Sequence, residues 1–268
     1  MIAASARRGV AALLCLLPLA AAAAPPVMLE ALTSTELRER IAAGTTTALV
    51  PIGATEQNGP HMVLGKHNVR VRVLAERIAE QLGDAVVAPV LAYVPEGSID
   101  PPAGHMRFAG TLSIPEPVFE ALLESTARSL RQHGFTAIVL LGDHGGYQKS
   151  LRKVADKLSR EWAGRGAQVL APPEYYRVVQ TDFVEMLKAR GQPAAAIGTH
   201  AGLADTALAL AVDPSLVRPQ ALAQAAQAGA REGVSGDPRG ATAELGRLGT
   251  DRIVEATVAA IRQHTRRR

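Results

Sequence analysis

The segment "TTALVPIGATEQNGPHMVLGKHN" (46–68) joins a short apolar run to a loop rich in polar side chains. The run at 46–53 is continuously apolar, which is typical of a strand buried on both faces of a parallel sheet. The loop that follows contains Glu56, His61 and His67, and carboxylates and imidazoles are common metal ligands. The segment is therefore either an ordinary loop after a strand or part of a metal site.

The rest of the chain alternates between strand-like and helix-like patterns. Three further apolar runs are predicted strands, at 85–94, 136–143 and 167–176. Predicted amphipathic helices lie at 68–83, 115–134 and 146–164, and further helices at 200–212 and 251–264. This alternation predicts a single α/β domain with a mainly parallel sheet and helices on both faces. Because such sheets bind ligands at the carboxyl ends of their strands, we expect the polar loops to share one rim.

The N-terminus has the pattern of an export signal. Arg7 and Arg8 precede an apolar run, and alanines near 22–24 offer a small-residue cleavage site. A membrane anchor is the alternative, but the run is shorter than the roughly 20 residues that a spanning helix needs. We predict a signal peptide at 1–24, a mature domain at 25–268, no membrane segment in the mature form, and a secreted or periplasmic protein.

Composition excludes several kinds of site. Cys15 is the only cysteine and lies in the predicted signal peptide, so neither disulfides nor thiolate metal sites are expected in the mature chain. Arg7 and Arg8 contribute two positive charges to the formal net charge of +4. The mature body is close to neutral and only 3% of residues are aromatic, so we expect no nucleic-acid partner.

Several histidines fall in loops or at helix starts: His61, His67, His105, His144 and His200. His144 lies in "GDHGG" (142–146), where glycines leave room for a ligand to approach. The alternative is that the glycines only make the turn and His144 caps the helix. His200 precedes a predicted helix with Asp205 in its first turn, which is also a common structural position for an aspartate.

Five segments in the same order resemble the signature segments of the creatininase (creatinine amidohydrolase) family. They are "VPIGATEQNGPHMVLGKHN" (50–68), "GHMRFAGTLSI" (104–114), "GFTAIVLLGDHGGY" (134–147), "THAGLADTALAL" (199–210) and "GVSGDPRGATAELG" (233–246). The resemblance implies an α/β metal-dependent hydrolase that acts on amide C–N bonds, and a homo-oligomer.

The resemblance also implies ligand positions, and several of them are changed here. Glu56 and His144 match metal ligands of the family. Asn58 stands where a ligand histidine is usual, and His67 stands where an aspartate usually bridges two ions. Asp205 stands where the family has a ligand glutamate.

A neutral imidazole has one free lone pair and cannot bridge two ions as a carboxylate does. We therefore predict one divalent ion, zinc in the first place with manganese or iron as alternatives, held by Glu56, His67, His144 and Asp205. Asp205 is the predicted proton shuttle, and His200 and His61 are predicted to orient the water or the oxyanion.

The predicted reaction is hydrolysis of an amide C–N bond in a small, possibly cyclic, molecule by a metal-activated water. The altered ligands leave a second interpretation open. In that interpretation the protein has lost catalysis and binds a small molecule or an ion.

Overall fold

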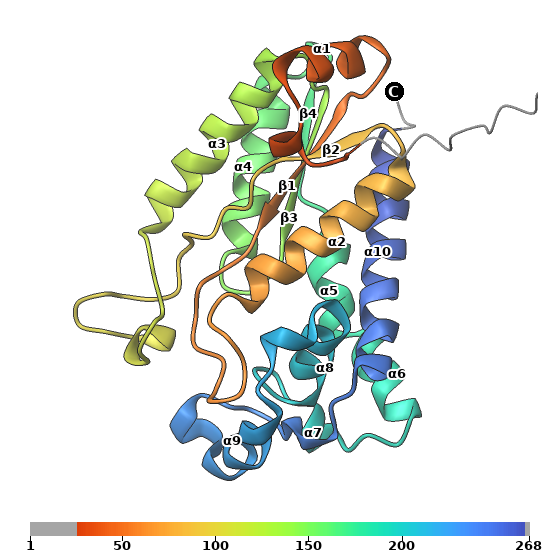
Figure 1. Ribbon diagram of the computed structural model, residues 1–268. Coiled ribbons are helices and arrows are strands. Elements are labelled where there is room, and N and C mark those ends of the chain that lie inside the picture. Colours follow the sequence, from red (N-terminus) through yellow and green to blue (C-terminus); the bar gives the residue numbers. More distant parts are fainter. Residues whose placement is uncertain (1–25, 266–268) are drawn as a thin grey trace, which may run out of the picture.

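A computed structural model describes residues 26–265, which form one α/β domain around a parallel sheet (Figure 1). The sheet has the order β2-β1-β3-β4. Its strands are β1 (Thr47–Ile52), β2 (Ala85–Val87), β3 (Ala137–Gly142) and β4 (Gln168–Leu170). All three strand pairings are parallel, and every residue of β1 and β3 is buried. The predicted fold class is confirmed.

Helices make up most of the remaining described chain. They are α1 (Ser34–Ala42), α2 (Lys66–Leu82), α3 (Glu116–Gln132), α4 (Gln148–Glu161), α5 (Glu174–Gln180), α6 (Asp182–Ala189), α7 (Ala194–Ile197), α8 (Leu203–Val212), α9 (Leu222–Ala228) and α10 (Ala243–Thr265). No helix between residues 26 and 265 is long and apolar enough to cross a membrane. The predicted signal peptide lies outside the described residues.

Alternate residues of the central strands feed two apolar clusters, one on each face of the sheet. Leu49 and Val139 pack with α2, α5, α8 and α10, whereas Val50 and Leu140 pack with α3 and α4. This is the period-two alternation of side chains along a strand. The helices therefore cover both faces, as Figure 1 shows.

Two predicted strands are shorter than the apolar runs suggested, and proline explains both ends. β2 ends at Val87, and Pro89 follows two residues later. β4 ends at Leu170, and the run continues into Pro172 and then into α5. Proline has no backbone N–H for the ladder, so regular pairing is interrupted beside it; beyond Pro89 an isolated parallel bridge joins Ile52 and Leu91.

The loops that follow the first three strands meet at one edge of the sheet, as expected from parallel strands. They are 53–65, 88–115 and 143–147. The second of them includes a projecting arm, residues 93–112, drawn in yellow in Figure 1. This edge holds a cluster of polar side chains around Glu56.

Candidate metal centre

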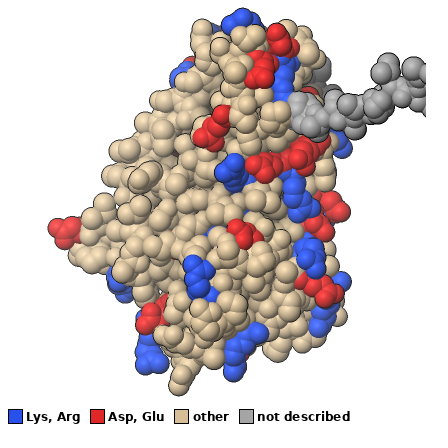
Figure 2. All heavy atoms as spheres, viewed as in Figure 1, with Lys and Arg blue, Asp and Glu red and all other residues tan. Residues whose placement is uncertain are grey.

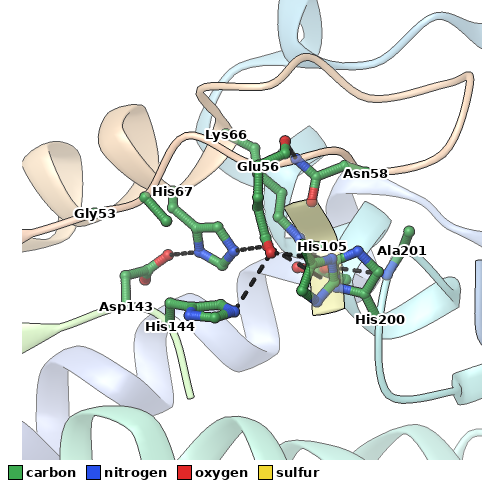
Figure 3. A network of polar contacts seen from close by, with 12 residues as sticks. Gly53, Glu56, Asn58, Lys66, His67, His105, Asp143, His144, His200 and Ala201 are labelled. Atoms are coloured by element: carbon green, nitrogen blue, oxygen red, sulfur yellow. Dashed lines mark hydrogen bonds and ion pairs between the residues drawn. The ribbon is translucent and has the colours of Figure 1, made fainter. Parts of the chain in front are cut away.

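Glu56 is the centre of the polar cluster, and four imidazoles face its carboxylate (Figure 3). Its side chain is fully buried. His67 Nε2 lies 2.8 Å and His200 Nδ1 lies 3.9 Å from Oε1. His144 Nε2 lies 3.4 Å and His105 Nδ1 lies 3.5 Å from Oε2. Burial raises the pKa of Glu56, but the polar contacts and charges of His144 and His67 outweigh it and hold that pKa well below its usual range.

Two groups of potential ligand atoms share Glu56. One adds His67 and His144, and the other adds His105 and His200; within each group the atoms lie within 4.8 Å of one another. Oε2 of Glu56 is buried and has no hydrogen-bond partner among the described residues. A buried carboxylate oxygen that faces imidazole nitrogens without a hydrogen bond fits a bound cation, because a cation would satisfy it.

His67 is held from behind by a second carboxylate. It lies in the first turn of α2, and its Nδ1 is 2.6 Å from Asp143 Oδ2, just beyond β3. Arg70, on the same face of α2, donates from Nε to Asp143 at 2.9 Å. This arrangement fixes the ring of His67 with Nε2 toward Glu56.

The glycines around His144 serve close packing. Gly146 N–H donates to His144 Nδ1 at 3.2 Å, and a Cβ on Gly146 would lie 3.0 Å from the ring. A Cβ on Gly145 would lie 2.6 Å from the hydroxyl of Tyr176. The ring of His144 therefore packs closely against the backbone of Gly146 in the same turn. Burial lowers the pKa of His144, but Glu56 outweighs this and raises it overall.

Asp205 is not brought into either ligand group. Its carboxylate contacts the ammonium of Lys66 and lies 2.9 Å from Arg70 Nη1, and it also accepts from Ala201 N–H. Burial raises the pKa of Asp205, but the charges of Lys66 and Arg70 prevail and hold it well below its ordinary value. A carboxylate so stabilised is a poor base and is already neutralised by cations.

His61 and Asn58 support the loop after β1. His61 is fully buried, and its Nε2 contacts Thr206 Oγ1 at 2.9 Å. Burial lowers the pKa of His61 to about 4. Asn58 donates from Nδ2 to the backbone oxygens of Glu56 and Val63. Among the described residues, neither side chain lines the cavity beside the centre.

That cavity has a volume of about 300 Å³ and is lined by His67, His144, His105 and His200 among others. His200 Nε2 lies 3.1 Å from the backbone oxygen of Gln57. Burial and the charge of Lys66 lower the pKa of His200 to about 4, and burial lowers that of His105. Both imidazoles are therefore neutral near pH 7.

The residues that sequence reasoning missed are the partners of the imidazoles and of Asp205. Asp143 is adjacent to His144, and Arg70 follows His67 by one helical turn, so these two could have been suspected from spacing. Glu96 carries no such signal, because only the fold brings it to His144. Burial raises the pKa of Glu96 to about 8, even though His144 acts in the opposite direction.

A parallel α/β sheet with two imidazoles and a carboxylate converging beside its strand ends is suited to a metal-dependent hydrolase. The sequence matches the Creatininase family, described as creatinine amidohydrolase, over residues 30–261. The chain belongs to this family.

Relatives and solved structures agree with this assignment. The creatinine amidohydrolase of Pseudomonas putida is 30% identical over 196 residues, covering 69% of this chain and 72% of the relative. The mycofactocin precursor peptide peptidase of Mycolicibacterium smegmatis is 37% identical over 124 residues, covering 44% and 47%. A crystal structure of creatininase superposes with a TM-score of 0.73 at 25% identity, covering 90% of this chain and 98% of the other.

Proposed function

We propose that this protein is a metal-dependent amidohydrolase that cleaves an amide C–N bond in a small molecule. The single observation that carries the proposal is the convergence of His67 and His144 on Glu56 beside an open cavity. Two similar proteins are named as amidohydrolase and as peptide peptidase, and both names describe hydrolysis of C–N bonds. A cyclic amide or the end of a short peptide is the substrate class that these relatives favour.

The proposed cofactor is one divalent ion held by Glu56, His67 and His144. Two histidines and one glutamate form a ligand set used by catalytic zinc, with positions left for water and substrate. Solved creatininases at 26% identity are described as a manganese form and as a Zn-Zn form, so zinc leads, with manganese and iron as alternatives. Such an ion would supply Lewis acidity toward a carbonyl and activate a water near neutral pH.

The chain's own groups supply the rest of the proposed chemistry. His200 and His105 line the cavity as neutral imidazoles, so each can hydrogen-bond a water or a substrate. Because His200 Nε2 is anchored at Gln57, its Nδ1 is directed toward Glu56. We assign to His200 the orientation of the attacking water, because a pKa of about 4 makes its ring a weak base near neutral pH. The geometry favours a structural role for Asp205 and His61.

We further propose that the protein is exported and forms homo-oligomers. Export rests on the N-terminal sequence pattern. Oligomer formation rests on large apolar side chains exposed on the arm and on α3, namely Tyr93, Ile99, Val118 and Leu122. Figure 2 shows few charged side chains over this side of the molecule. Exposed apolar clusters of this kind are typical of interaction surfaces.

The alternative function is a binding protein without catalysis, because Asn58 has replaced a ligand of the resembled pattern. The two functions are separated by an activity screen of the full chain with cyclic and linear amides. The proposal predicts hydrolysis that is abolished by a chelator, restored by zinc or manganese, and lost in His144→Ala. Glu39→Gln, an exposed change on α1, should retain activity. Binding of an amide without turnover by metal-loaded protein would favour the alternative.

A further inference from the structure

Lys66 is a buried lysine that lines the cavity beside Glu56. It begins α2, its side chain is 1% exposed, and its ammonium contacts one carboxylate oxygen of Asp205. An ammonium has three N–H donors. Among residues 26–265, Asp205 supplies the one hydrogen-bond acceptor that this ammonium meets. Two donors of a buried charged group are therefore left for a ligand in the cavity, and leaving such donors unpaired is costly.

Arg70, the neighbouring cation in the cavity wall, has its nitrogens engaged by the protein. Its Nε donates to Asp143 at 2.9 Å, and its Nη1 donates to Asp205 at 2.9 Å. Its Nη2 lies 3.2 Å from Nδ1 of His67. Among the described residues, Lys66 and Arg70 are the lysine and arginine side chains that line this cavity, and Lys66 is the one with unused donors.

The positive charge of Lys66 acts on the imidazoles of the cavity wall. Burial is the main cause that lowers the pKa of His200 to about 4, and the charge of Lys66 is the next. Asp205 acts on His200 in the opposite direction and more weakly, although it is paired with Lys66. Burial also lowers the pKa of His105, and the charge of Lys66 adds to this effect. The ammonium is therefore not screened from the cavity by its own ion pair.

The charges around the cavity favour an anionic ligand once the proposed ion is bound. Lys66 and Arg70 balance the carboxylates of Asp143 and Asp205. A divalent ion held by Glu56 and neutral imidazoles then leaves the site with an excess of positive charge. A negatively charged group of the ligand neutralises this excess, and the attraction is strong because the groups are shielded from water.

Part of the same cavity wall is apolar. Val179 of α5, Val184 of α6, Ile197 of α7 and Ala204 of α8 line it. Ligand cavities commonly combine such a wall with a few polar groups that fix the orientation of the ligand. An apolar substituent can pack against these side chains while an anionic group meets Lys66.

We propose that Lys66 binds a carboxylate of the substrate through its two unused N–H donors. The substrate is then an amide that carries a free carboxylate and an apolar group, as the C-terminal end of a short peptide or an N-acyl amino acid does. This inference rests on the proposed amidohydrolase function and narrows its substrate class. It favours the end of a peptide over a neutral cyclic amide.

The experiment compares two ligands that differ in charge. N-benzoylglycine is an amide with a carboxylate and an apolar ring, and N-benzoylglycinamide is its neutral counterpart. The Kd of each is measured by calorimetric titration of the metal-free full-length protein, so that the proposed hydrolysis does not interfere. The proteins are the wild type, Lys66→Met, Lys66→Arg and the control Lys157→Met, an exposed change on α4.

We expect the Kd of N-benzoylglycine to rise about 10-fold or more in Lys66→Met, because charge-assisted hydrogen bonds are lost. Lys66→Arg, which keeps the charge, should recover most of the affinity, and Lys157→Met should match the wild type. The Kd of N-benzoylglycinamide should be similar in all four proteins. Asp205 keeps Arg70 and the Ala201 N–H as partners in Lys66→Met, and retained binding of the neutral ligand shows that the cavity is folded.

An equal loss of affinity for both ligands in Lys66→Met would overturn the inference, because it would give Lys66 a structural role only. N-benzoylglycine binding that is absent in the wild type, or unchanged in Lys66→Met, would also overturn it. Binding that depends on Lys66, without hydrolysis of any amide by the zinc-loaded wild type, would support the carboxylate subsite and contradict the proposed function. Hydrolysis with the same kcat/KM for both compounds in the wild type and in Lys66→Met would uphold the function and overturn the role of Lys66.

Discussion

Arg70 Nη1 lies 2.9 Å from Asp205 Oδ1, and the ammonium of Lys66 contacts the other oxygen of the same carboxylate. The residue that sequence reasoning placed in the metal shell is thus paired with two cations from α2. The ligand group that we propose for the ion is Glu56 with His67 and His144, one of the two groups that share Glu56.

Asp205→Asn should destabilise the protein without removing the metal. The change leaves the side chain of Lys66, which is 1% exposed, without its anionic partner. Loss of one partner from a buried pair destabilises by about 3–5 kcal/mol. Urea unfolding measures the stability, and metal analysis of the folded protein measures the content. Loss of metal with unchanged stability would instead show that Asp205 is a ligand.

The metal-free protein should lose stability in acid, and part of this loss should come from protonation of Asp205 and Asp143. The pKa of each lies below its ordinary value of 3.8, chiefly because cationic partners, Arg70 in both cases, outweigh burial. The stability that they contribute is therefore present above that value and is lost as pH falls through the lowered folded pKa. Acid titration followed by circular dichroism should show a weaker dependence in Asp205→Asn. An identical slope in both proteins would refute this assignment.

His144→Ala and His200→Ala should separate metal binding from the orientation of the attacking water. The first removes a ligand beside Glu56, so metal content should fall below about one tenth of the wild type. The second removes a neutral imidazole outside the proposed ligand group, so metal should remain while turnover falls roughly 100-fold or more. Metal content and kcat of each variant are the measurements. Equal loss of metal in both would assign His200 to the ligand shell.

Metal affinity should weaken as the solution is acidified through neutrality. Glu56 raises the pKa of His144 above its ordinary 6.5, although burial opposes this, so protons compete with the ion for this ring. The zinc Kd measured between about pH 8 and pH 6 should increase as pH falls. In His200→Ala the same trend should persist, because the pKa of His200 is only about 4 and its ring stays neutral over this range.

The fold could be predicted from sequence because its signals are local. Continuous apolar runs indicated buried strands, and the runs that became β1 and β3 were placed nearly to the residue. The ends of β2 and β4 were harder to predict. The apolar pattern continues past Val87 and Leu170, whereas the prolines that follow interrupt the regular ladder. The last helix was also predicted short, because its first turns lack a strong apolar pattern.

Residues of the polar cluster could be predicted from the sequence only where they directly follow a strand. Glu56, His67 and His144 follow β1 and β3, and parallel strands bring such loops to one edge. Asp205 was predicted as a metal ligand because it stands where the resembled family has a ligand glutamate. In the structure its carboxylate contacts Lys66 and Arg70, which belong to another helix, α2. Nothing in the spacing of the chain reveals those long-range ion pairs.

The central claim is that one ion is bound by Glu56, His67 and His144. Anomalous diffraction from crystals of the full chain, grown with zinc or soaked in it, tests this claim most directly. We predict one strong peak at about 2.0–2.3 Å from the Glu56 carboxylate and from Nε2 of both His67 and His144. A peak on Asp205, two peaks of equal height around Glu56, or no peak at the centre would contradict the account.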